Sequence, residues 1–98
     1  MKKTIILGKE HDDRLRSTLV ELVKDMGGRT LNKSWGVGGT QEVEIWEVEM
    51  NGSEITFEAE TYIGLSISGE QEIVDEFASR LTERLRNHDR SSSSNDIP

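Results

Sequence analysis

The first quarter of the chain has the pattern of a short strand followed by an amphipathic helix. Residues 4–7 form a short apolar run, rich in β-branched side chains and bounded by lysines and Gly8, which predicts a strand buried on both faces. From Asp12 or Asp13 onward, apolar side chains recur at three- and four-residue spacing, as Leu15, Leu19, Leu22, Val23 and Met26. This spacing predicts a helix with an acidic first turn, closed by Gly27-Gly28.

The middle of the chain carries the clearest structural signal, a hairpin around Asn51-Gly52. An Asn-Gly pair between two alternating runs is the strongest short-range indicator of a two-residue hairpin loop. In that register, one face of the hairpin holds five large apolar side chains, Trp46, Val48, Met50, Ile55 and Phe57. Val43 and Ile45 fall out of phase with them, which we interpret as a bulge near Ile45 or as cover from another element.

The segments on either side of this hairpin are less regular. Residues 29–40 mix apolar, polar and glycine positions, so we expect a short edge strand near residues 30–32 and otherwise a flexible loop. After a bend near Thr61 and Tyr62, residues 63–68 alternate apolar with small side chains and predict another strand. Ser68 and Gln71 approximate a capping box for a second helix. Its apolar stripe is Ile73, Val74, Phe77, Ala78, Leu81 and Leu85.

Together these elements predict a single α/β domain of the α+β type. The order β-α-β-β-β-α gives a mainly antiparallel sheet of about four strands with both helices on one face, a two-layer sandwich whose other face is open to water. The chain has 98 residues, and 24 of them are Leu, Ile, Val or Phe, which suits one small domain. We place this domain at residues 1–87. We expect the Ser-rich residues 88–98, which offer almost nothing to bury, to be a disordered tail.

Composition narrows the class of protein further. The chain has no cysteine, which excludes disulfides and thiolate metal sites. No run approaches the roughly 18 consecutive apolar residues that a membrane helix needs. We therefore expect a cytoplasmic protein that does not bind membranes. The formal net charge of -7 argues against nucleic acid as a partner, because neutralising phosphates supplies most of that affinity.

Charge is segregated along the chain. Residues 1–33 hold eight basic and five acidic side chains, whereas residues 34–79 hold eleven acidic side chains and no lysine or arginine. In the predicted hairpin register, the acids on the solvent face are Glu47, Glu49, Glu54, Glu58 and Glu60. Like charges opposed across strands are destabilising, and no lysine lies between them. A face of one sign also speeds and orients the encounter with a partner of the opposite sign.

These observations predict a non-enzymatic module whose acidic sheet face binds a basic macromolecular partner, in the manner of an inhibitor or an immunity protein. The five glutamates supply the charge, and Trp35 is a candidate anchor, although packing of Trp35 onto the domain is the simpler expectation. A second interpretation of the same acids is solubility and the protection of an edge strand. A homodimer formed through the open face or an edge strand would use these same surfaces.

The alternative function is a small-ligand-binding or regulatory module. Its pocket would lie between the glycine-rich residues 36–40, Tyr62 and the start of the first helix. Residues 36–40 lack the strand-loop-helix context and the Lys-Ser/Thr ending of a phosphate-binding loop. His11-Asp12-Asp13 has no second cluster at metal-ligand spacing, and nothing assembles around Glu60 and Tyr62 for acid-base chemistry. We therefore expect no catalytic residue, no metal and no cofactor.

Overall fold

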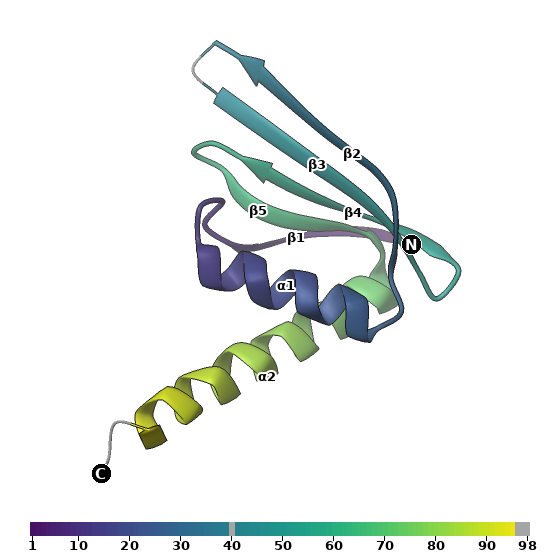
Figure 1. The fold of residues 1–98 in the computed structure, drawn as a ribbon. Coiled ribbons are helices and arrows are strands. Elements are labelled where there is room, and N and C mark those ends of the chain that lie inside the picture. Colours follow the sequence, from purple (N-terminus) through teal and green to yellow (C-terminus); the bar gives the residue numbers. More distant parts are fainter. Residues whose placement is uncertain (40, 96–98) are drawn as a thin grey trace.

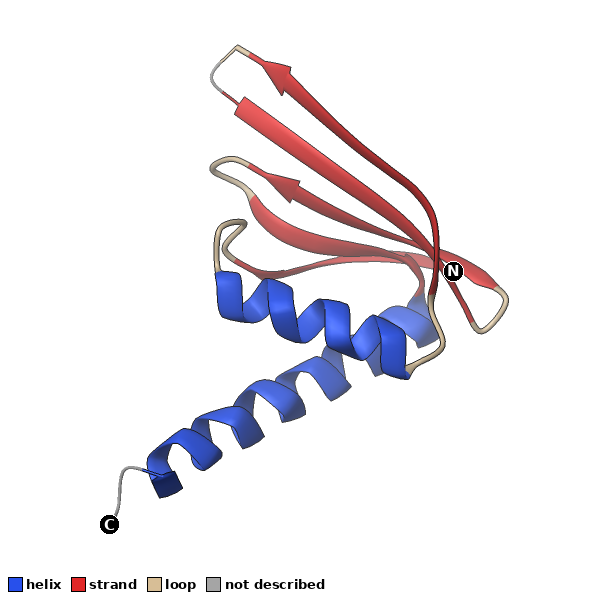
Figure 2. Ribbon diagram, in the orientation of Figure 1, coloured by secondary structure: helices blue, strands red, loops and turns tan. Residues whose placement is uncertain are grey.

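Residues 1–39 and 41–95, the part of the chain that the computed structural model describes, form a five-stranded antiparallel sheet with two helices on one of its faces (Figures 1 and 2). Side chains are described through residue 87. The elements are β1 (Lys2–Gly8), α1 (Asp13–Asp25), β2 (Arg29–Gly38), β3 (Gln41–Met50), β4 (Ser53–Glu60), β5 (Gly64–Glu70) and α2 (Gln71–Asn95). Across the sheet the strand order is β1-β5-β4-β3-β2. The predicted α+β class is confirmed, with one strand more than the four expected.

The β3–β4 hairpin has the predicted turn and register. Asn51 and Gly52 have φ angles of 53° and 77°, the left-handed values that a two-residue type I′ turn requires. Met50 pairs with Ser53 and Trp46 pairs with Phe57, as expected. The bulge expected near Ile45 was wrong, because the pairing of β3 with β4 is uninterrupted.

Two strand predictions need correction, and both concern the edges of the sheet. Residues 29–38, expected to be mostly loop, form the ten-residue strand β2, because β3 offers a long partner whose backbone hydrogen bonds do not depend on side-chain pattern. A register shift between Thr30 and Asn32 is the only irregularity in their described pairing. The strand β1, expected to be buried on both faces, pairs only with β5 among the described strands, and Ile6 is 58% exposed.

The first helix begins and ends where the sequence predicts. The side chain of Asp12 accepts a hydrogen bond from the backbone amide of Leu15 at 3.0 Å, which caps α1. Gly27, with a φ of 75°, follows the C-cap residue Met26. The helix is therefore delimited by local chemistry at both ends.

The second helix begins later than the capping-box prediction required. Ser68 lies in β5, and its hydroxyl is 2.8 Å from that of Thr4 on β1, so its expected role as a helix cap was wrong. The first residue of α2 is instead held by β1, since the amide of Gln71 donates to the carbonyl of Met1 at 2.8 Å. The backbone of α2 runs to Asn95. The predicted tail, residues 88–98, lies outside the described side chains, and its disorder stays a prediction.

The hydrophobic core fills the space between the sheet and the two helices. The apolar side chains predicted to meet there do so, with Phe57 lying between Trp46 and Phe77 at centroid distances of 5.4 and 5.1 Å. An ion pair between Arg84 and Asp25 joins α2 to α1. The buried apolar residues are Leu15, Leu19, Leu22, Val23, Val48, Met50, Ile55, Phe57, Ala59, Leu65, Ile67, Val74, Phe77 and Leu81.

Candidate functional site

The open face of the sheet carries the five glutamates that the sequence singles out. Strand alternation places every second residue of β3 and β4 away from the helices, because the residues between them are core residues. On this face Glu49 lies directly opposite Glu54. Glu47, Glu58 and Glu60 follow the same alternation. We call the set of Glu47, Glu49, Glu54, Glu58 and Glu60 the acidic face.

Two carboxylates of the acidic face lie close enough to influence each other. A hydrogen bond with Glu47, and repulsion from its charge, raise the pKa of Glu54, while the positive charge of Lys2 acts in the opposite direction. The amide of Asn32 also donates to Glu47 Oε1 at 3.4 Å. The Glu54 carboxyl thus holds its proton more tightly than an isolated glutamate would.

The basic groups that form ion pairs on the open face lie at its two edges. Arg29 on β2 pairs with Glu49 at 2.9 Å. At the other side of the sheet, the amino group of Met1 lies 3.0 Å from Glu70 and lowers the pKa of that carboxyl. Among the described residues, no basic group lies within ion-pair distance of four members of the acidic face, Glu47, Glu54, Glu58 and Glu60.

The part of the open face where β1, β5 and β4 meet carries small polar side chains. Thr4 and Ser68 share a hydrogen bond between their hydroxyls, and Thr56 is paired with Ser68 on the neighbouring strand. A shallow depression of about 280 Å³ beside Glu54 is lined in part by Lys2, Thr4 and Thr56. Elsewhere on this face the apolar side chains of Val43 and Ile45 lie opposite Glu60 and Glu58, and both glutamates are half-buried.

Trp35, the candidate anchor, lies on the other face of the sheet. It is paired with Glu44, whose carboxylate reaches the helix side of the sheet and pairs with Arg16 on α1. Trp35 is 63% exposed, so the expectation that it packs onto the domain was wrong. The structure therefore does not bring Trp35 together with the acidic face.

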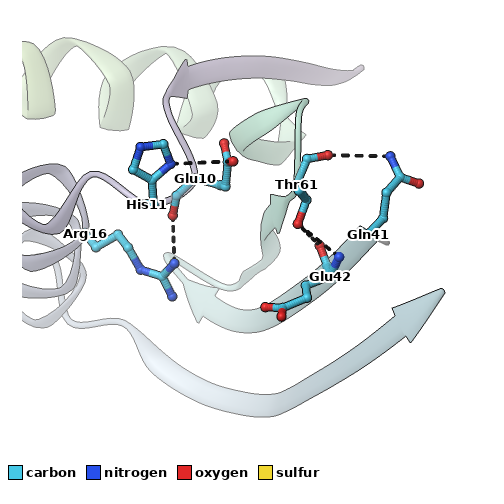
Figure 3. A network of polar contacts seen from close by, with 6 residues as sticks. All are labelled: Glu10, His11, Arg16, Gln41, Glu42 and Thr61. Carbon is cyan, nitrogen blue, oxygen red and sulfur yellow. Dashed lines mark hydrogen bonds and ion pairs between the residues drawn. The ribbon is translucent and has the colours of Figure 1, made fainter. Parts of the chain in front are cut away.

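The region proposed for the alternative ligand site is held by a network of polar contacts (Figure 3). The amide of Glu42 donates to the hydroxyl of Thr61 at 3.0 Å, which ties the β4–β5 loop to β3. Arg16 donates to the carbonyl of Glu10 at 2.7 Å, and His11 lies 3.6 Å from the Glu10 carboxylate. Hydrogen bonds from its own amide and from that of Tyr62 lower the pKa of Glu10. These contacts connect loops to one another and account for the polar groups without a ligand.

The glycine-rich segment is not the flexible loop that the ligand-site prediction assumed. Gly36 and Gly38 are part of β2, Thr40 lies outside the described residues, and Tyr62 is 81% exposed. A larger pocket, of about 380 Å³, opens instead between α1 and the β2–β3 hairpin. Sequence analysis missed this pocket because residues 29–38 were expected to be a loop. Without a strand, Lys33 and Trp35 could not be assigned to either face of the sheet. Alternation along residues 33–37, with polar or glycine positions between Lys33, Trp35 and Val37, was the available signal.

Within residues 1–39 and 41–95, no three His, Asp or Glu side chains are grouped so that they could hold a metal ion. None of the helices in this part of the chain has both the length and the apolar character to cross a membrane. Comparison of the chain with known proteins finds no matching family model, no matching curated protein and no matching solved structure. Function is therefore inferred from the chain's own residues.

Proposed function

We propose that the protein is a non-enzymatic binding module whose acidic face, formed by Glu47, Glu49, Glu54, Glu58 and Glu60, binds a basic protein partner. The observation that carries this proposal is that Glu54 lies directly opposite Glu49 in the sheet and near Glu47, whose hydrogen bond and charge raise the pKa of Glu54. Among the described residues, no basic group lies within ion-pair distance of the pair Glu47 and Glu54. Such a pair costs stability in the free protein. An arginine or lysine of a partner placed between the two carboxylates would remove the repulsion and form charge-assisted hydrogen bonds.

The position of the acids in the sheet argues against edge protection as their purpose. Acidic or basic side chains discourage unwanted strand pairing when they lie on an edge strand. The acidic face lies on β3 and β4, and both strands have a neighbour on each side. Solubility alone would be served equally well by interspersed charges of both signs. Concentration of one sign on two interior strands is what a complementary surface requires.

The sign of the face also selects the kind of partner. A second copy of this chain facing the sheet would oppose glutamates with glutamates, which is unfavourable. A basic protein would instead be attracted before contact, and that attraction weakens as salt screens it. The proposed complex is therefore one with a basic surface, of the type formed by an inhibitor or immunity protein with its target.

The test compares three immobilised forms of the protein in lysate of its native host. The first is wild type. The second carries Glu47→Gln, Glu49→Gln, Glu54→Gln and Glu58→Gln on the open face. The matched control carries the same change at four exposed glutamates of the helices, Glu21, Glu72, Glu76 and Glu83. Each variant removes four negative charges from a formal net charge of -7, so the two variants have the same net charge.

The expected result is a basic protein retained by wild type and by the helix variant, lost from the open-face variant, and released by moderate salt. Titration of that protein against all three forms then checks direct binding. Equal retention by all three forms would contradict the proposal. Equal loss from both variants would show that net charge, and not the acidic face, governs the interaction.

A further inference from the structure

The pocket between α1 and the β2–β3 hairpin lies on the face of the sheet opposite the acidic face. Its floor includes Phe57, Ala59 and Leu65, and the indoles of Trp35 and Trp46 also line it. Its volume of about 380 Å³ falls in the range of pockets that hold small molecules. The lining is mostly apolar, with a few polar groups that would orient a ligand.

The pocket exists because the hairpin is longer than the helix layer that covers it. Figure 1 shows that the end of β2 and the start of β3 lie away from both helices. Trp35 on β2 and Val20 on α1, which line opposite sides of the pocket, are 63% and 38% exposed. Large apolar side chains are ordinarily buried, so an occupant that covers both would gain the free energy of removing this surface from water.

The charged groups at the pocket differ in whether they already have an ion-pair partner. Arg16 pairs with Glu44 and also donates to the carbonyl of Glu10 at 2.7 Å, so these two opposite charges neutralise each other. The ammonium group of Lys33 lies 5.2 Å from the centre of the Trp46 ring. In the described part of the chain, no carboxylate lies within ion-pair distance of Lys33. Lys33 is therefore the positive charge available to an incoming ligand.

We propose that this pocket binds a small molecule with an apolar body and a single carboxylate. The body would lie between Trp35 and Trp46 over the apolar floor, and the carboxylate would pair with Lys33. A cationic ligand fits less well, because Glu44, the acidic residue of the lining, is already paired with Arg16. This site is independent of the proposed function, since it uses the helix side of the sheet.

Tryptophan fluorescence can report ligand binding at this pocket directly. They are the only tryptophans of the chain, and both line the pocket. Three probes with the same eight-carbon body, octanoate, octanol and octylamine, separate the contributions of body and head group in a fluorescence titration. We expect a saturable change with octanoate, weaker binding of octanol and the weakest binding of octylamine.

Substitution at Lys33 tests the head-group contact. Lys33→Gln is expected to weaken octanoate binding about tenfold, the loss of one charge-assisted contact, and to leave octanol binding unchanged. Lys24→Gln, at an exposed lysine of α1 that does not line the pocket, is the control and should bind both probes as wild type does. Equal effects of the two lysine substitutions on octanoate would overturn the assignment of Lys33.

Filling the pocket tests its location without changing charge. Ala59→Leu adds bulk to the floor and should abolish binding of both octanoate and octanol, while far-ultraviolet circular dichroism shows that the fold is kept. Wild-type binding by a folded Ala59→Leu variant would overturn the proposal, as would the absence of a saturable change in wild type. Sedimentation that shows a dimer with Trp35 protected from quenching would also overturn it. The open-face glutamine variant should bind octanoate normally, which separates this proposal from the acidic face.

Discussion

Neighbouring residues of β3 lie in opposite environments on the two faces of the sheet. Val48 is fully buried under the helices, whereas Glu47 and Glu49 on either side of it lie on the open face. The covered face is required for folding, because burial of its apolar side chains drives the chain to collapse. The open face has no such requirement, and its like-charged pair works against stability. A feature that costs stability on a surface free to vary is the better indicator of function.

The largest difference between the faces should appear when an aromatic side chain is truncated. Phe77→Ala removes a fully buried ring that packs against Phe57, and we expect it to lower the free energy of unfolding by about 3–5 kcal/mol. Tyr62→Ala, at a residue that is 81% exposed, should change it by about 0.5 kcal/mol or less. Urea unfolding measures both. Similar losses in the two variants would mean that the core is not organised around Phe77.

Backbone geometry should produce the next largest effect. Gly64 has a φ of 121°, and a Cβ added there would lie 2.6 Å from the carbonyl oxygen of Gly8, so Gly64→Ala should cost about 1–3 kcal/mol or more. Gly36 on β2 has open space where a Cβ would be, and Gly36→Ala should be neutral or stabilising by about 0.5 kcal/mol. Thermal unfolding of both variants provides the comparison. A neutral Gly64→Ala variant would contradict the close contact between the end of β1 and the start of β5.

The pKa values of two carboxyl groups on the open face should be shifted in opposite directions. Contact with Glu47 raises the pKa of Glu54, whereas the amino group of Met1 lowers the pKa of Glu70. NMR titration of the side-chain carboxyl carbons should therefore place Glu54 above the ordinary glutamate value and Glu70 below it. Glu47→Gln should lower the pKa of Glu54 and leave that of Glu70 unchanged. If Glu47→Gln shifted the pKa values of both Glu54 and Glu70, the cause would be the overall charge of the face and not the contact between Glu47 and Glu54.

The same two pKa shifts give stability opposite dependences on pH. The raised pKa of Glu54 means that its repulsion with Glu47 costs stability above the unfolded-state pKa. This cost begins to disappear as the pH falls through the raised folded-state pKa. The lowered pKa of Glu70 means that its contribution is complete above the unfolded-state pKa and is lost as the pH falls through the lowered folded-state value. Unfolding of wild type and Glu47→Gln across the acid range should separate the two.

The smallest effect is expected for the peripheral ion pair. Arg29 and Glu49 lie 2.9 Å apart, but their side chains are 71% and 44% exposed. Arg29→Gln should therefore lower the free energy of unfolding by less than about 1 kcal/mol at low salt, and the difference from wild type should shrink as salt is added. A loss as large as that of Phe77→Ala would contradict the expectation that an exposed ion pair contributes little to stability.

Sequence pattern predicted those elements whose signals are local. The Asn51-Gly52 turn sets the register of β3 and β4, and through it the membership of the acidic face. The first helix was found because its apolar spacing and its Asp12 cap lie within a few residues of one another. The strand β2 was not found, because its glycines and polar residues carry little strand propensity and its pairing with β3 supplies the stability.

The remaining misjudgements share this cause. Ser68 is of a residue type that often caps helices. Pairing with β1 instead extends the strand β5 beyond Ser68, so α2 begins at Gln71. Trp35 could be assigned to no face until residues 29–38 were known to be a strand. The pocket that it lines combines residues from α1, β2, β3, β4 and β5, which no local pattern brings together.

Sequence alone was sufficient for the α+β class, the central hairpin, the first helix and the grouping of five glutamates, because each depends on residue spacing and turn chemistry within one short segment. Tertiary structure decided the strand order, the conversion of residues 29–38 into an edge strand, the separation of Trp35 from the acidic face, and the pocket beside Lys33. These features depend on which distant segments supply backbone hydrogen bonds and apolar cover. That choice is made by the free energy of the whole fold and not by any single stretch of the chain.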